Sequence, residues 1–203
     1  MSRVICLIDG FNLYHSISED LSLRQYKWLD LQGFARSFLR SGETLANLYY
    51  FTSLAHWDPS KQEKHKRYIR VLRDRGVNVV YGKFKAKEET CRICHKDYST
   101  WEEKRTDVNI AVTLFRLAHE NKFDTALLMS GDTDLAPAVE IVRSSFPEKK
   151  VGVIFPIRRK NIELEAVASF TMKIHHGRFT GYRLPDSVSL KDGRTITCPP
   201  EWM

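Results

Sequence analysis

The chain has 203 residues, a length at which one domain can bury a substantial core. Hydrophobic residues make up 42% and charged residues 28%, and no run approaches the roughly 20 apolar residues that cross a bilayer, which excludes a membrane-spanning helix and predicts a soluble globular domain. The formal net charge of +7 favours anionic partners such as nucleic acids, although many basic proteins bind none.

The N-terminus and the cysteines indicate a reducing environment. The chain runs directly into an apolar, strand-like stretch ending at Asp9, without the longer apolar segment and cleavage site of a signal peptide, so we expect a cytoplasmic protein. Four cysteines, at positions 6, 91, 94 and 198, do not form a dense disulfide framework. Free thiols or one metal-binding pair fit this spacing better.

Apolar, β-branched runs alternate with segments of helical period along most of the chain. Strands are predicted over residues 4–9, 46–53, 77–84, 125–130, 151–155 and 172–175. Helices are predicted over residues 31–40, 59–75, 106–120, 133–144 and 161–169. This alternation is typical of a parallel sheet covered on both faces. It predicts the α/β class, as a three-layer sandwich with a mainly parallel central sheet of five or six strands.

Two segments interrupt the alternation. Residues 85–104 are polar, contain Cys91 and Cys94, and have neither strand nor helix period, so we interpret them as an insertion. The segment from Gly177 onward contains several prolines and glycines and is predicted to pack as an extended strap. We therefore expect one domain over residues 1–176, with an insertion at about 85–104, and a tail over 177–203.

Three aspartates follow predicted strands at the edge where α/β sheets bind ligands. Asp9 ends the first strand, and Asp132 and Asp134 follow the strand TALLMS in the turn SGDTD. Ligands of an open α/β sheet bind outside the carboxyl ends of its strands. These three side chains should therefore emerge at one edge.

Asp107 reaches the same edge from a helix. It extends by one turn the apolar stripe of the predicted helix 106–120, which contains Leu114 and Leu117. A charge on a buried helix face is costly unless it is paired or coordinates a cation. In a right-handed crossover the first turn of this helix lies above the carboxyl edge of the sheet. All four aspartates can therefore converge.

Four neighbouring carboxylates repel one another unless cations neutralise them. Mg²⁺ binds oxygen ligands of this kind and keeps positions for water and for substrate phosphate oxygens. One or two such ions lower the pKa of a bound water and stabilise the leaving oxygen of a phosphoryl displacement. The set predicts hydrolysis of phosphodiester bonds by metal-activated water.

Individual aspartates also have a purely structural interpretation. Asp9 with Gly10 could form a simple turn, Asp132 could be a helix N-cap, and Asp134 could be a favourable charge in the first turn of a helix. Their joint placement, together with Asp107 on a buried helix face, favours the metal site.

Three motifs resemble the NYN domains of the PIN-like nuclease superfamily. They are IDGFNLY at 8–14, KRTDVNIAV at 104–112 and LLMSGDTDLAPAV at 127–139, in the order of the family, and the resemblance covers most of the chain. It implies a compact PIN-like, Rossmann-like parallel sheet with an acidic pocket that binds Mg²⁺ or Mn²⁺ and cleaves RNA endonucleolytically.

The resemblance also implies roles for particular residues. By position, the catalytic and metal-binding carboxylates would be Asp9, Asp107, Asp132 and Asp134. Asn12 and Ser130 would support them through hydrogen bonds, and Thr133 would contact a ligand.

Cys91 and Cys94, followed by His95, depart from the family pattern and form half of a structural zinc site. Tetrahedral zinc needs four ligands, and the second half is not evident; His95, Cys198, a histidine such as His65 or a neighbouring subunit are candidates. The alternative is two free thiols in a loop. We keep both interpretations.

Basic and aromatic residues near the predicted edge are candidates for nucleic-acid contacts. Arg158, Arg159 and Lys160 follow a predicted strand there. Phe11 and Tyr14 lie beside Asp9, where their rings could stack on the bases of single-stranded RNA. The helix predicted over 59–75 is also strongly basic. The alternatives are a solvated basic face and aromatic residues of the core.

The sequence thus predicts a divalent-metal-dependent endoribonuclease that acts on nucleic acid, foremost single-stranded RNA. One alternative is a non-catalytic nucleic-acid-binding or partner-recruiting module that keeps the fold. Another is a small-molecule phosphatase that forms a covalent aspartyl phosphate. Such an enzyme would need an acidic residue two positions after Asp9, but that position is Phe11. A homodimer remains open.

Overall fold

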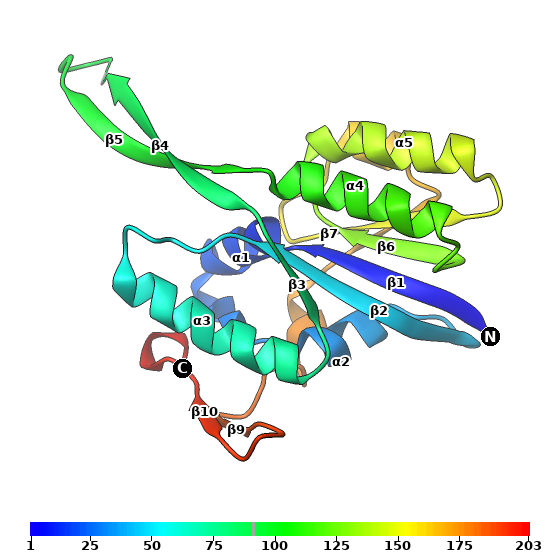
Figure 1. The fold of residues 1–203 in the computed structure, drawn as a ribbon, viewed down its shortest axis with the longest axis horizontal. Helices are drawn as coiled ribbons and strands as arrows, with labels where there is room; N and C mark the ends of the chain where they lie inside the picture. Colours follow the sequence, from blue (N-terminus) through cyan, green and yellow to red (C-terminus); the bar gives the residue numbers. More distant parts are fainter. Residues whose placement is uncertain (91) are drawn as a thin grey trace.

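A six-stranded parallel sheet forms the centre of the molecule (Figure 1). The structure is a computed structural model that describes residues 1–90 and 92–203. The strand order is β3-β2-β1-β6-β7-β8, and all neighbouring strands pair in parallel. The strands are β1 (Ser2–Asp9), β2 (Glu43–Thr52), β3 (Asn78–Tyr81), β6 (Thr125–Met129), β7 (Lys150–Phe155) and β8 (Phe170–Lys173). The predicted α/β class with a parallel sheet of five or six strands is confirmed.

The helices cover both faces of the sheet. One face carries α1 (Gly10–Ser18), α2 (Leu31–Arg36) and α3 (Pro59–Asp74), and the other carries α4 (Thr106–His119), α5 (Ala136–Ser145) and α6 (Ile162–Val167). Strand β1 shows why its apolar run is continuous. Cys6 and Ile8 pack into the core on the α1 side, whereas Ile5 and Leu7 pack into the core on the α4 side, so residues of both orientations are buried.

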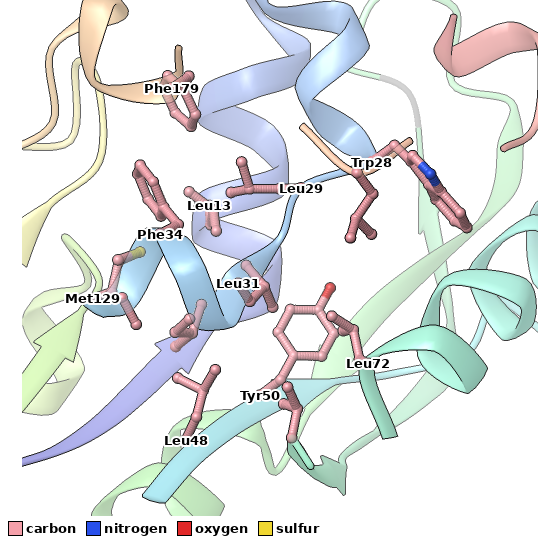
Figure 2. Packing of buried hydrophobic residues seen from close by; sticks show 14 of the residues in the cluster. Leu13, Trp28, Leu29, Leu31, Phe34, Leu48, Tyr50, Leu72, Met129 and Phe179 are labelled. Atoms are coloured by element: carbon pink, nitrogen blue, oxygen red, sulfur yellow. The ribbon is translucent and has the colours of Figure 1, made fainter. Parts of the chain in front are cut away.

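The core on the α1 side is rich in aromatic rings (Figure 2). Phe34 of α2 stacks on Phe179 with 5.1 Å between the ring centroids. Trp28, at the end of the 3-10 helix η1 (Leu21–Lys27), donates a hydrogen bond from Nε1 to the carbonyl of Pro185 at 2.9 Å. The C-terminal segment therefore contributes to this core.

Most predicted helices were found, with changed ends. The predicted helix 31–40 ends at Arg36, and the one predicted over 133–144 begins as the 3-10 helix η2 (Thr133–Leu135) before α5. Helix α1 was not predicted. It follows β1 without a loop, because the side chain of Asp9 caps it by accepting a hydrogen bond from the backbone of Asn12 at 3.0 Å.

Residues 85–104, which we interpreted as an insertion without strand or helix period, contain regular structure that the sequence pattern did not predict. Strands β4 (Lys83–Thr90) and β5 (Asp97–Lys104) form an antiparallel hairpin that projects from the body (Figure 1). Most of its side chains are exposed, so the alternation of apolar and polar residues that marks a half-buried strand is missing. The predicted strand 77–84 is accordingly divided at Gly82 between β3 and β4.

The tail predicted as an extended strap contains elements of its own. These are the 3-10 helices η3 (His176–Phe179) and η4 (Pro200–Trp202) and the two short antiparallel strands β9 (Ser187–Ser189) and β10 (Thr195–Thr197). Phe179 and Trp202 are buried in the core on the α1 side. Among the residues that the structure describes, no helix combines the length and the apolar character needed to cross a bilayer.

Candidate acidic active site

A cavity of about 400 Å³ opens beyond the carboxyl ends of β1 and β6. We call it the acidic cavity. Its walls come from the end of β1, helix α1, the base of the β4–β5 hairpin, the start of α4, the turn after β6 and the segment after β7; they consist of Asp9, Phe11, Asn12, His15, Phe84, Trp101, Glu103, Thr106, Asp107, Asp132 and Arg159. Its position is the one expected for ligands of an open α/β sheet.

Asp9 is the most deeply held carboxylate. The residue is 4% exposed, and its two carboxylate oxygens accept hydrogen bonds from the backbone of Asn12 at 3.0 Å and from Ser130 Oγ at 2.8 Å. Burial raises the pKa of Asp9, and the charge of Asp132 raises it further. Asp9 therefore serves both as the N-cap of α1 and as a wall of the cavity.

The turn after β6 is tied to α1 by hydrogen bonds. Ser130 Oγ also accepts from the backbone of Asp132 at 3.1 Å, and Asn12 Oδ1 accepts from the backbone of Gly131 at 3.1 Å. A Cβ on Gly131 would lie 2.0 Å from the carbonyl oxygen of Arg159, so only glycine permits this approach. These contacts hold Asp132 at the edge of the cavity.

Asp107 lies partly buried in the first turn of α4. Burial raises its pKa to about 6, and the charges of Asp132, Asp9 and Asp134 contribute in that order. The predicted repulsion among the four aspartates is thus present at this position.

Glu103 is a fifth carboxylate at the site, and the sequence analysis missed it. It extends from β5 and accepts a hydrogen bond from Thr106 Oγ1 at 2.6 Å. Burial raises its pKa to about 7, with smaller contributions from Asp9 and Asp107. No local signal marks it, because residues 97–104 are polar without a strand period; only the structure places Trp101 and Glu103 on the same, partly buried face of β5.

The four predicted aspartates do not have equal positions. Asp9, Asp107 and Asp132 line the acidic cavity. Asp134 is exposed and does not line it, although its charge acts on Asp107, and its backbone donates to Asp132 Oδ1 at 3.1 Å. Thr133 is partly buried at the start of η2.

Of the three basic residues predicted to contact nucleic acid, only one lines the acidic cavity. Arg159 lines the acidic cavity and pairs with Glu19, and its Nε is buried without a hydrogen-bond partner in the described part of the chain. Arg158 is exposed outside the cavity, and Lys160 pairs with Glu165 at 2.6 Å. Arg159 is therefore the cation that a phosphate in the cavity would meet.

The two predicted aromatic contacts, Phe11 and Tyr14, both extend from α1. Phe11 lines the acidic cavity, and Tyr14 lines a neighbouring cavity. Cys91, one of the two predicted zinc ligands, lies outside the described residues, and Cys94 is exposed. The zinc site stays a prediction.

The residues of the acidic cavity fit a hydrated divalent cation. The acidic donors are all carboxylate oxygens, which Mg²⁺ and Mn²⁺ prefer. Within residues 1–90 and 92–203, no group of three or more His, Cys, Asp or Glu side chains is arranged to hold a metal ion. An open set of this kind suits an ion bound through one or two carboxylates, with water and substrate phosphate completing its shell.

Comparison with known proteins shows one family and two proteins to which this chain is similar. A family model described as NYN domain matches residues 3–173. The 6-hydroxy-3-succinoylpyridine 3-monooxygenase HspA of Pseudomonas putida (strain DSM 28022 / S16) is 28% identical over 240 aligned positions, which cover 98% of this chain and 74% of that protein. The crystal structure of a protein of unknown function from Vibrio parahaemolyticus RIMD 2210633 matches with a TM-score of 0.59 and 22% identity, covering 88% of this chain and 95% of the other. This last likeness concerns the fold alone.

Proposed function

Because this chain belongs to the NYN domain family, we propose that it is a divalent-metal-dependent endoribonuclease that hydrolyses phosphodiester bonds at the acidic cavity. The observation that carries the proposal is that Asp9, Asp107 and Asp132 line one cavity together with Arg159. Three carboxylates alone would repel a phosphate, so the arrangement makes chemical sense with a cation between them.

We assign each residue a role that its contacts support. Asp9, Asp107 and Asp132 would hold one or two Mg²⁺ or Mn²⁺ ions, and Asp134, which is exposed, would act through water. Such an ion, when bound, lowers the pKa of water and stabilises developing negative charge on the phosphate. Arg159, which lines the cavity, would orient a phosphate oxygen through its guanidinium group.

Asn12 and Ser130 position the carboxylates. The hydroxyl of Ser130 donates a hydrogen bond to the side chain of Asp9 and accepts one from the backbone of Asp132, so it fixes the positions of these two acidic residues relative to each other. Asn12 joins α1 to the turn at Gly131. Thr133 begins η2 beside Asp132 and would contact substrate from there.

The test is cleavage of labelled single-stranded RNA and matched DNA by purified protein with Mn²⁺ or Mg²⁺, and with chelator. Asp132→Asn should lower the rate by more than about 100-fold, because it removes a metal-binding charge. Asp192→Asn, on the tail and outside the cavity, is the matched control and should leave the rate unchanged. Equal cleavage by Asp132→Asn would indicate a contaminating nuclease and sink the proposal. Metal-independent RNA binding without turnover would favour the non-catalytic module.

A second candidate function is action on a small aromatic substrate. The relative from Pseudomonas putida bears the name of a monooxygenase for such a compound. The observation that favours this candidate is a second cavity, rich in aromatic rings, which shares residues with the acidic one. Binding of a free aromatic anion by a protein that cleaves no RNA would support it.

A further inference from the structure

A second cavity, of about 570 Å³, adjoins the acidic cavity. We call it the aromatic cavity, after the rings of Tyr14, Tyr50, Trp57, Tyr68, Phe84 and Trp202 in its walls. The two cavities share Phe11, His15 and Phe84. The volume of the aromatic cavity falls within the range of about 300–1,000 Å³ that is typical of sites for small organic ligands. A ligand could therefore extend from one cavity into the other.

The rings of this cavity are held by one another and by the hairpin. Trp57 stacks on Trp101 of β5, with centroids 4.3 Å apart and planes 3° from parallel, and meets Phe84 of β4 edge-on at 4.6 Å. Deeper in the cavity, Tyr68 lies 6.2 Å from Tyr50. Flat, fixed rings of this kind accept a planar aromatic ligand by stacking or edge contacts.

Positive charges surround the same rings. Arg24, Lys27, Lys61 and Lys64 line the cavity against a single carboxylate, Glu201. Glu201 is engaged by Lys64 at 2.7 Å. Lys27 lies over the ring of Tyr14, 5.0 Å from its centroid; Lys61 pairs with Asp58 at 3.2 Å, and its side chain is 72% exposed. An anionic substituent on the ligand would thus find cations at the mouth.

A titratable polar group, His65, lies on the inner wall. His65 contacts the hydroxyl of Thr52 at 3.3 Å, and burial lowers the pKa of its imidazole to about 4. The ring is therefore neutral at physiological pH and offers one donor or one acceptor, according to its tautomer. Such a group can form a hydrogen bond with the polar edge of a heterocyclic ligand.

We infer that the aromatic cavity is a subsite for one nucleotide of a single-stranded substrate. The base enters among the rings beside Tyr14, its phosphate meets Lys27 and Lys61, and the adjoining phosphodiester lies in the acidic cavity. The assignment rests on the proposed ribonuclease function. A base can enter only when it is unstacked and unpaired, so the subsite selects single strands over duplexes.

The same chemistry, a flat ring with an anionic substituent, also describes a free aromatic anion. The test therefore uses three probes in chelator, where cleavage is not required: a fluorescently labelled single-stranded RNA long enough to form a stable duplex, that duplex, and pyridine-3-carboxylate. Trp57 and Trp202 line the cavity, so tryptophan emission reports occupancy independently of nuclease activity.

Tyr14→Ala should weaken binding of the single-stranded RNA by about 10-fold or more and reduce the tryptophan response, as expected when a stacking partner is lost. The matched control is Tyr81→Ala. Tyr14 is 40% and Tyr81 39% exposed, but Tyr81 does not line the cavity, and its variant should bind as the unmodified protein does. Circular dichroism checks that both variants fold, and Lys27→Gln is the second pocket variant, expected to weaken the same binding.

Equal RNA affinity for Tyr14→Ala, Lys27→Gln and the unmodified protein would overturn the inference. So would equal affinity for duplex and single strand, or saturable binding of pyridine-3-carboxylate that RNA does not displace. Absence of cleavage with Mn²⁺, alongside Tyr14-dependent RNA binding, would instead refute the nuclease proposal and leave a nucleotide-binding cavity.

Discussion

The carboxylates in and beside the acidic cavity differ in how deeply they are buried and how many hydrogen bonds they accept. Asp9 is almost fully buried and has hydrogen-bond donors on both oxygens, whereas Asp134 stands in solvent. Between these extremes, Asp107 and Glu103 have raised pKa values because they are partly desolvated close to other acids. The folded protein thus keeps a repulsion that a bound cation would relieve.

Glu103→Gln is expected to stabilise the protein in chelator as the pH rises. Glu103 has a pKa of about 7 in the folded state against an ordinary value of 4.5, so the folded state binds more protons between these values and loses stability as pH rises through them. Glutamine does not ionise. The variant should gain about 1–3 kcal/mol over the unmodified protein at pH 8 and little at pH 4.5, measured by urea unfolding.

The control for this prediction is the neighbouring Glu102→Gln. Glu102 is exposed and pairs with Lys104 at 2.5 Å, which lowers the pKa of the carboxyl. Its variant should show no gain at alkaline pH. A difference between Glu103→Gln and the unmodified protein that stays constant from pH 4.5 to 8 would contradict the assignment.

At the scale of elements, the acidic cavity depends on places where separate segments approach closely. The turn after β6 touches the backbone of the segment after β7 at Gly131 and Arg159. The base of the hairpin reaches the start of α4 at Gly82, where an added Cβ would lie 2.5 Å from Thr106 Oγ1. Both approaches bring a side chain, Arg159 or Glu103, to the cavity.

Gly131→Ala should therefore impair both stability and cleavage. Its methyl group would overlap the carbonyl of Arg159, and the turn that carries Asp132 would have to move. We expect a loss of about 1–3 kcal/mol in the free energy of unfolding and a clear fall in the rate of RNA cleavage. Gly177→Ala, where an added Cβ meets nothing within 4 Å, should be neutral in both assays. An unchanged rate for Gly131→Ala would show that the position of this turn does not matter.

At the scale of the whole molecule, the C-terminal segment completes the core on the α1 side. Phe179 is fully buried against Phe34, and Trp202 lies 6.3 Å from Trp28 (Figure 2 shows Phe34, Trp28 and Phe179). The tail also places Glu201 and Trp202 in the wall of the aromatic cavity. It is therefore part of the structure that supports the proposed nucleotide subsite.

Phe179→Ala is expected to cost about 3–5 kcal/mol in the free energy of unfolding, because it leaves a hole among packed rings. Urea unfolding followed by circular dichroism measures this loss. Phe179 lines neither the acidic nor the aromatic cavity, so Mn²⁺-dependent cleavage should persist under conditions in which the variant is folded. Leu21→Ala is the control, because Leu21 is 86% exposed and its loss should change stability little. A loss below about 1 kcal/mol for Phe179→Ala would mean that the tail is not integral to the core.

The sequence by itself determined the fold class and the edge of the sheet at which the acids lie. The continuous apolar run of β1 can be buried only between two helical layers, and parallel strands end together, so Asp9 and Asp132 had to emerge side by side. The helical period before Leu114 placed Asp107 at the same edge. These signals can be found in short stretches of sequence, because each strand or helix that packs in the sheet layers carries its own pattern of apolar residues.

Only the tertiary structure decided which further groups join the acids. The hairpin is exposed along most of its length and leaves no burial pattern in the sequence. No pattern in the sequence therefore predicts that Glu103 lines the acidic cavity. Arg159 reaches the acidic cavity because the segment after β7 packs against the turn at Gly131, and the exposure of Asp134 is likewise visible only in the folded chain. Contacts between segments distant in the chain are set by packing, and no local period records them.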